Sequence, residues 1–336
     1  MKICIYGIGA VGGLIGARLA AEGSTVVSAV ARGATLAALN SGGLRLQSGD
    51  HLTQTQIRAA EHPADLGVQD IVVVSVKGPA LAAVAAGIAP LLGPDTVVLS
   101  AMNGVPWWFF DGAGGQCAGM HLESVDPGGV VTAAIPARRV VGCVVHLNVA
   151  APEPGLVLHR MGNGLIVGEP DGSASARVQQ IAQLLARTGF DVTISPRIQN
   201  DIWYKLWGNL TFNPISALTG AAGDRILADP LVLAFCTSAM EEAARIGERI
   251  GCEIRQTPQE RHAVTRKLGA FRTSMLQDAE AGRPLEIDAI VGAAKEIGER
   301  VGVATPTIDA LLGLIRLYGR TRGLYPPQTE QTGSDT

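Results

Sequence analysis

Three glycines near the start of the chain have the spacing of a phosphate-binding turn. Gly7, Gly9 and Gly12 follow a short apolar run, Lys2–Tyr6, and precede an Ala-rich stretch that extends to Ala21. In a strand–turn–helix unit these glycines allow the tight turn, the approach of a pyrophosphate and close helix–sheet packing. The helix start would offer N–H groups and a positive dipole end. The pattern predicts a dinucleotide site at Gly7, Ile8, Gly9, Ala10, Val11 and Gly12, the alternative being a turn without a ligand.

A second polar group lies in the C-terminal half. Lys205, Asn209 and Asn213 recur at i, i+4 and i+8, so a helix over 199–218, interrupted near Pro214, would project all three from one face. The surrounding residues are apolar: Trp203, Leu206, Leu210 and Phe212. A cation and two amides on a largely buried helix need partners. A ligand is one such partner, and a hydrated surface face is the alternative.

Two more polar residues follow predicted buried strands. The near-continuous apolar runs at 70–76 and 95–100 are typical of parallel strands covered on both faces. Lys77 follows the first run and Asn103 the second, at the sheet edge where ligands collect. The Asn103 amide could reach both a nicotinamide and a substrate, although an Asn-Gly turn explains the same residue.

Arg32 follows the second predicted strand, at 25–31. In NAD-binding forms of this unit an acidic residue stands there and accepts the ribose 2′-hydroxyl. A guanidinium suits a 2′-phosphate instead. The sequence therefore favours NADP over NAD, with an exposed loop arginine as the alternative.

The elements that position these residues change character near residue 196. Strand and helix signals alternate up to there, and only helices follow, so we predict an α/β Rossmann-like domain at 1–195, a helical substrate and dimerisation domain at 196–322 and a disordered tail at 323–336. Helices are expected at 173–188, 230–250, 258–281, 284–301 and 306–320. Ser274 would lie late in the third of these and Glu286 in the first turn of the fourth, where an acid also suits the helix dipole.

The segment from residue 105 to 138 has no regular pattern and holds four consecutive aromatics, Trp107–Phe110. Two interpretations are open. The aromatics form a lid over the active site, or they form a contact between subunits that would make a homodimer plausible.

Bulk properties exclude several classes of protein. The 336 residues suffice for two domains. A net charge of −3 without a basic run gives no support for nucleic-acid binding. The most apolar stretch, 80–92, is too short to cross a membrane, and the N-terminus does not resemble a signal peptide. Five scattered cysteines suggest reduced thiols in the cytoplasm, and six dispersed histidines predict no metal site.

Several short motifs occur together in one order. They are GIGAVGG at 7–13, SVKG at 75–78, MNGV at 102–105, KLWGNLTFNPISALTG at 205–220, TSMLQD at 273–278 and LEID at 285–288. In this combination the chain resembles the ketopantoate reductases (2-dehydropantoate 2-reductases), to about residue 320. The resemblance implies a Rossmann-like domain, then an all-α domain like the C-terminal domain of 6-phosphogluconate dehydrogenase. It also implies NADPH-dependent reduction of a 2-keto acid, foremost 2-dehydropantoate in pantothenate biosynthesis, in a cleft between the domains.

The resemblance also implies roles for single residues. Lys205 matches the general acid that protonates the carbonyl oxygen, Asn103 an amide touching nicotinamide and substrate, and Glu286 an acid that binds the cofactor and supports the site. The remaining matches are substrate contacts at Asn209, Asn213 and Ser274 and cofactor contacts at Lys77 and Arg32.

The chain departs from the family at two places. Gly223 stands where well-known members have an asparagine that binds the distal hydroxyl of the substrate, and the segment 105–138 is longer. A different or bulkier keto acid, oxidation of another 2-hydroxy acid, and a non-catalytic NADP-binding regulator therefore stay open.

Overall fold

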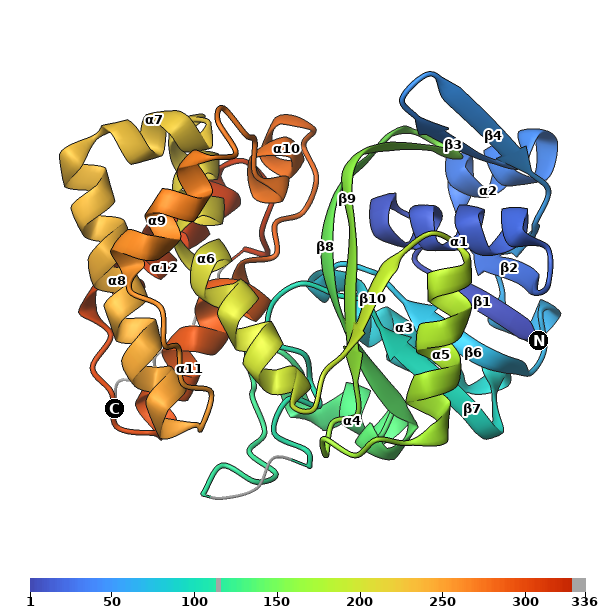
Figure 1. The fold of residues 1–336 in the computed structure, drawn as a ribbon, viewed down its shortest axis with the longest axis horizontal. Coiled ribbons are helices and arrows are strands. Elements are labelled where there is room, and N and C mark those ends of the chain that lie inside the picture. The colour runs from blue at the N-terminus through green and yellow to red at the C-terminus, as the bar shows by residue number, and fades with distance from the viewer. Residues whose placement is uncertain (113–115, 328–336) are drawn as a thin grey trace, which may run out of the picture. The chain divides into compact units, whose positions relative to one another are not determined.

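The computed structural model describes residues 1–112 and 116–327 and divides the chain into two compact units (Figure 1). Unit 1 is Met1–Ile202 and unit 2 is Trp203–Thr336. The division falls inside one helix, α6 (Ile198–Thr219). The domain limits at 195 and 322 stay a prediction.

A mixed sheet forms the centre of unit 1. Its strands are β1 (Lys2–Tyr6), β2 (Val26–Val30), β3 (Leu44–Ser48), β4 (His51–Thr55), β5 (Arg58–Ala60), β6 (Gln69–Val74), β7 (Leu92–Ser100), β8 (Val140–Glu153), β9 (Leu156–Gly168) and β10 (Asp191–Ile194). Their order is β4-β3-β9-β8-β7-β6-β1-β2-β5, with β10 beside β9. The six neighbouring strands β8, β7, β6, β1, β2 and β5 are parallel to one another. The chain moves to opposite sides of β1 to form β2 and β6, which makes the carboxyl end of β1 the place where ligands bind in such sheets.

Helix α1 (Ala10–Glu22) lies between the parallel strands and a long curved hairpin of β8 and β9 (Figure 1). Ile5 of β1 packs near Gly16 on one side of the helix. Val157 of β9 packs against Gly13 on another side, where an added Cβ would lie 2.5 Å from Val157 Cγ2. The helix that follows the glycine turn is therefore fixed by two layers of sheet. The other helices of unit 1 are α2 (Gly33–Gly42), α3 (Leu81–Gly87), α4 (Val130–Ala134) and α5 (Ala176–Arg187).

The four consecutive aromatics are buried in the folded chain. Each of Trp107–Phe110 is at most 6% exposed. Trp107 Nε1 donates to the carbonyl oxygen of Ile135 at 2.9 Å, and the Trp108 ring fills the space beside Gly142. These side chains are covered by their own chain, which removes the exposed aromatics on which the subunit-contact interpretation depends, and the lid over the active site stays a prediction.

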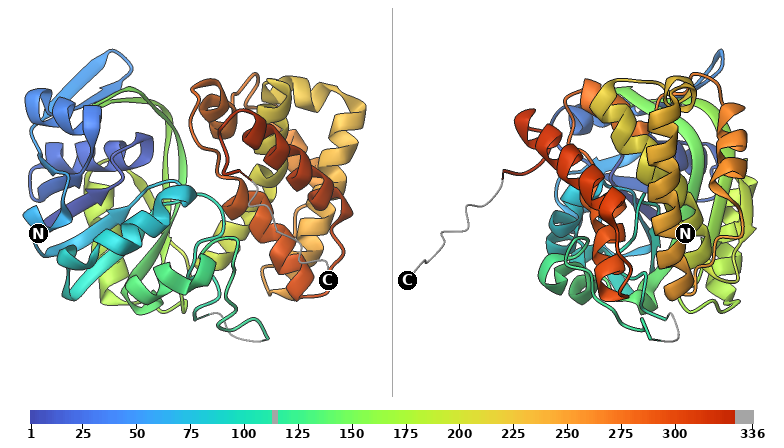
Figure 2. Two further views of the ribbon diagram at one scale, coloured as in Figure 1. Left: turned by 180° about the vertical axis from the view of Figure 1, so that it is seen from behind. Right: turned by 90° about the vertical axis from the view of Figure 1, so that its left-hand side faces the viewer.

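Unit 2 is helical in its described residues. After α6 come α7 (Gly223–Ala228), α8 (Pro230–Arg249), α9 (Pro258–Arg266), α10 (Ser274–Glu280), a π-helical turn (Asp288–Gly292), α11 (Ala293–Arg300) and α12 (Pro306–Thr321). Figure 2, seen from behind, shows α12 across the face of the unit opposite α9. Among the described residues no helix combines the length and apolarity needed to cross a membrane. The predicted fold class, a Rossmann-like domain followed by an all-α domain, is confirmed.

Several helices begin or end at other residues than predicted, because of tertiary contacts. Helix α6 continues through Pro214, and it is tied to α8 by Trp203 and Trp207, whose Nε1 groups donate to carbonyl oxygens of α8 at 3.2 and 2.7 Å. The predicted helix 258–281 is two helices, α9 and α10.

The predicted disordered tail begins with an ordered segment. Leu324 is buried, and the Tyr325 hydroxyl donates to Asp288. Disorder was therefore the wrong prediction for 323–327, and 328–336 lie outside the described residues.

Candidate cofactor and catalytic site

Two of the three glycines in the β1–α1 turn are required by the packing of the protein itself. Gly7 has φ +103°, and a Cβ there would lie 2.7 Å from Val76 Cγ1. A Cβ on Gly12 would lie 2.2 Å from Ser75 Oγ and 2.3 Å from the Gly7 carbonyl oxygen. Ser75 holds this arrangement, since its Oγ donates to that same carbonyl at 2.8 Å. The turn is thus tied to the segment that follows β6.

Gly9 needs a different explanation. It is the exposed N-cap of α1, and among the described residues no atom beyond its two chain neighbours lies within 4 Å of the position that its Cβ would take. The structure gives α1 no side-chain cap at this residue, and no acidic residue lies in its first turn. A glycine at the positively polarised N-terminus of a helix lets an anion approach the backbone closely. The residues present therefore fit the pyrophosphate of a dinucleotide.

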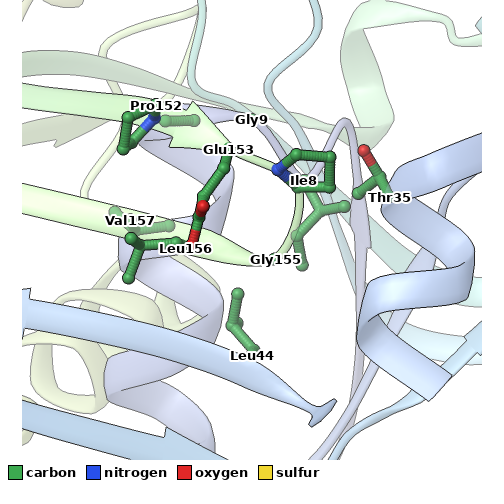
Figure 3. Close-up of a pocket in the computed structure, with 11 residues that line it drawn as sticks. Ile8, Gly9, Thr35, Leu44, Pro152, Glu153, Gly155, Leu156 and Val157 are labelled. Carbon is green, nitrogen blue, oxygen red and sulfur yellow. The ribbon is translucent and has the colours of Figure 1, made fainter. Parts of the chain in front are cut away.

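A cavity of about 230 Å³ opens beside this turn (Figure 3). Ile8 and Gly9 line it from the turn, Thr35 lines it from α2, and the tip of the β8–β9 hairpin supplies residues 151–157. The space therefore extends from the glycine turn toward the start of α2.

Arg32 is the N-cap residue of α2, and its side chain is exposed. Burial raises the pKa of Tyr6, the last residue of β1, and the Arg32 charge opposes that rise. The guanidinium thus acts electrostatically at the end of β1, where the glycine turn begins. This is a suitable position for binding a 2′-phosphate.

The structure also brings Lys77 and Asn103 to this edge of the sheet. The loops that hold them leave β6 and β7 side by side, and the Ala101 amide donates to the Val74 carbonyl at 2.9 Å. Both side chains are half-buried. Gly104 has φ +79°, so the Asn-Gly turn exists as well. Unit 1 therefore gathers the glycine turn, Arg32, Lys77 and Asn103 at the carboxyl ends of parallel strands.

Unit 2 carries the remaining predicted site residues. Lys205, Asn209 and Asn213 lie on the unbroken helix α6, so their spacing does place them on one face. Asn213 is 5% exposed, whereas Lys205 and Asn209 are half-buried. The hydrated-surface interpretation therefore fails for Asn213.

A hydroxyl network connects the end of this face with α10. Ser216 Oγ donates to the Asn213 carbonyl at 3.1 Å and is hydrogen-bonded to Thr273 Oγ1. Thr273 is the N-cap of α10 and accepts from the Leu276 amide at 3.1 Å. Ser274 is consequently the first residue of α10, not a late residue of a long helix, and it follows a residue tied to α6.

Glu286 is 9% exposed and lies before the π-helical turn. Its predicted place in the first turn of a helix was wrong, because residues 283–286 have no regular secondary structure and helical structure starts at Ile287. The stretch that carries it is held by a backbone hydrogen bond at Leu285 and a side-chain hydrogen bond at Asp288, described below.

Sequence reasoning missed Phe271, which fills the space beside Gly223. The Gly223 amide donates to the Phe271 carbonyl at 2.9 Å, and a Cβ at Gly223 would lie 2.0 Å from Phe271 Cε1. Phe271 also packs on Phe212, with ring centroids 6.0 Å apart. The glycine is therefore required by an aromatic ring 48 residues later in the chain, which no local pattern could reveal.

Comparison with known proteins agrees with these observations. The family model described as ketopantoate reductase PanE/ApbA matches residues 3–107, and the model of its C-terminal domain matches 197–319. The chain is 45% identical to the 2-dehydropantoate 2-reductase of Mesorhizobium japonicum, over 97% of this chain and 100% of that protein.

Solved structures show the same relation. A Ralstonia solanacearum protein assigned to the ketopantoate reductases is 58% identical, with a TM-score of 0.93 over 96% of this chain and 99% of that one. The 2-dehydropantoate 2-reductase of Geobacter metallireducens is 25% identical, with a TM-score of 0.83 over 95% of this chain and 100% of that one. The chain therefore belongs to the ketopantoate reductase family.

Proposed function

We propose that this protein catalyses the NADPH-dependent reduction of 2-dehydropantoate to pantoate, a step of pantothenate biosynthesis. The observation that carries the proposal is the end-to-end similarity to a 2-dehydropantoate 2-reductase at 45% identity. The glycine turn of unit 1 and the polar face of α6 in unit 2 supply residue types that this reaction needs.

Most of the proposed cofactor contacts are residues of the first 103 positions, and Glu286 would be a further contact. The turn Gly7, Ile8, Gly9, Ala10, Val11 and Gly12 would hold the pyrophosphate, Arg32 the 2′-phosphate, and Lys77 and Asn103 further parts of the molecule. Bound NADPH supplies the hydride. The open space at Gly9 and the exposed guanidinium of Arg32 support these assignments.

Lys205 would act as the general acid. Reduction of a ketone places negative charge on the carbonyl oxygen, and an ammonium group at hydrogen-bond distance both stabilises that charge and donates the proton. Such proton transfer is typically worth about 10²–10⁴-fold in rate. Glu286 would favour the charged form of Lys205, while Asn103, Asn209, Asn213 and Ser274 would bind the substrate.

A second candidate is a different 2-keto acid, or oxidation of the matching 2-hydroxy acid, on the same residues. The Phe271 ring beside Gly223 favours this candidate, because it places an apolar surface where an amide would otherwise bind a hydroxyl.

We also propose that the protein is a homodimer and is located in the cytoplasm. The buried aromatics of Trp107–Phe110 no longer support the dimer.

Replacing Lys205 tests the assigned chemistry. Lys205→Ala should lower kcat for 2-dehydropantoate by about 10²–10⁴-fold with little change in the Kd of NADPH. Lys267→Ala, at an exposed position after α9, is the control and should leave both quantities unchanged. An unaltered kcat in Lys205→Ala would remove Lys205 as the acid.

A further inference from the structure

The short segment after α12 is fastened to the stretch that carries Glu286. The Leu285 amide donates to the Leu324 carbonyl at 3.0 Å, and the Leu324 amide donates to the Gly319 carbonyl at 2.7 Å. Leu324 itself is 5% exposed and Leu285 is 1% exposed. The backbone one residue before Glu286 is therefore paired with a buried part of the C-terminal segment.

A second attachment lies two residues after Glu286. The Tyr325 hydroxyl donates to the Asp288 carboxylate, 2.8 Å from Oδ1 and 2.9 Å from Oδ2. Arg316 Nη2 donates to the same Oδ1 at 2.7 Å. Burial and the hydrogen bond to Asp288 raise the pKa of Tyr325 to about 12, so its hydroxyl stays a donor at neutral pH.

Three residues of α12 pack around Tyr325. A Cβ on Gly319 would lie 2.7 Å from Tyr325 Cβ, so only glycine lets the chain fold back at this point. The guanidinium groups of Arg316 and Arg320 lie 5.8 and 5.5 Å from the ring centroid, within the range of cation–π attraction. Asp288 also opens the π-helical turn, a rare geometry that is often found at functional sites.

We propose that Leu324 and Tyr325 form a clasp on Leu285 and Asp288 that positions the Glu286 carboxylate for the reaction. This inference rests on the proposed function, because it concerns the role of Glu286 there. Leu324 and Tyr325 are positioning residues in this proposal, because they act through the stretch that carries Glu286. Since Glu286 lies between the two attachments, loss of either one removes a restraint on its backbone. A displacement of about 1 Å in a catalytic site can cost about 10²-fold in rate.

The alternative is that the clasp only stabilises the fold, and the pH dependence of turnover separates the two roles. An ammonium group farther from a carboxylate loses its proton at a lower pH. If the clasp positions Glu286 beside the acid, its loss should move the alkaline decline of kcat to lower pH. A purely structural role would lower the unfolding temperature and leave the shape of the pH profile unchanged.

The experiment compares two variants of the full chain that each remove one hydroxyl. Tyr325→Phe removes the hydrogen bonds to Asp288 and keeps the ring. Tyr318→Phe is the matched control on α12, since its ring lies instead against Arg322, at 4.7 Å. We expect Tyr325→Phe to lower kcat about tenfold or more and to shift its alkaline limb to lower pH, and Tyr318→Phe to match the wild type.

Amide hydrogen exchange on the ligand-free protein gives a readout independent of activity. Tyr325→Phe should accelerate exchange in the peptide that holds Leu285–Asp288, while peptides of α8 keep their protection. Faster exchange with an unmoved pH profile would overturn the positioning role, and so would unchanged exchange. A wild-type protein without activity on 2-dehydropantoate would refute the proposed function and, with it, the role of Glu286 that the clasp serves.

Discussion

Gly9 offers the sharpest test of the cofactor site, because its side-chain position faces open space and not the protein. The variant Gly9→Ala adds one methyl group that meets no atom within 4 Å among the described residues beyond its two chain neighbours. The backbone there has φ −84°, so alanine does not require the left-handed region. The free energy of unfolding should therefore change by no more than about 0.5 kcal/mol, as at an ordinary surface site.

Binding should respond differently from stability. If the turn holds a pyrophosphate, the methyl group occupies space that the phosphates need. Overpacking by one methyl group typically costs roughly 1–3 kcal/mol, which corresponds to an increase in the Kd of NADPH of about 5- to 150-fold. Titration of NADPH by calorimetry measures this increase, and thermal unfolding of the free protein measures the stability.

Two further variants act as controls. Gly12→Ala should lower the stability itself, because its Cβ would lie 2.3 Å from the Gly7 carbonyl oxygen. Gly313→Ala, at an exposed position of α12 with nothing within 4 Å, should leave NADPH binding unchanged. Wild-type affinity for NADPH in a fully folded Gly9→Ala variant would refute the phosphate-binding role of the turn.

Three other predictions follow from charge and burial. Arg32→Ala should raise the Kd of NADPH by about 10- to 150-fold, because charge-assisted hydrogen bonds contribute roughly 1.5–3 kcal/mol. The Kd of NADH should stay nearly the same. Equal increases in both Kd values, measured by fluorescence titration, would contradict the 2′-phosphate role. Glu242 is 3% exposed and accepts hydrogen bonds from two amide N–H groups in the first turn of α12, at 2.9 Å each. Glu242→Gln should therefore lower the free energy of unfolding in urea by about 1–2 kcal/mol. Glu241→Gln, at an exposed neighbouring position, should leave it unchanged. The pKa of Tyr325 is raised from 10.0 to about 12 in the folded state, so the unfolded chain loses this proton first and stability should fall as the pH rises from 10 toward 12. Tyr325→Phe should show a smaller fall over that range, and an identical fall would contradict the assignment.

The parts of the site that sequence could predict depend on local geometry. The order of strand, glycines and helix at Lys2–Glu22 is a property of neighbouring residues, and so is the single face shared by Lys205, Asn209 and Asn213. The strands that end before Lys77 and Asn103 are marked by continuous apolar runs. Each of these features depends on the periodicity of backbone structure, which the sequence records directly.

The predictions that failed concern segments whose structure depends on contacts between residues distant in the sequence. Trp107–Phe110 looked exposed because no local pattern accompanied them, yet contacts such as that of Trp108 with Gly142 bury them. The tail looked disordered because of its composition, although Leu324 and Tyr325 bind a stretch about 37 residues earlier. Burial against remote partners overrides the local preference in both cases, and composition does not report it.

The limits of the helices around Glu286 and Ser274 illustrate the same point. Pro284 suggested the start of a helix, but the Leu285 amide is used by the Leu324 carbonyl and the helical structure starts only at Ile287. Thr273 became an N-cap because its hydroxyl accepts from the Leu276 amide, which divides what looked like one helix.

The most direct test of the proposed function is steady-state oxidation of NADPH by the purified protein, followed by absorbance, with 2-dehydropantoate and a panel of other 2-keto acids. The proposal predicts that 2-dehydropantoate gives the highest kcat/KM of the panel and that NADPH is preferred over NADH. A higher kcat/KM for another keto acid would keep the reaction type and replace the substrate, in agreement with the Phe271 ring beside Gly223. Absence of turnover with every keto acid, by a protein that still binds NADPH, would contradict the proposed reduction.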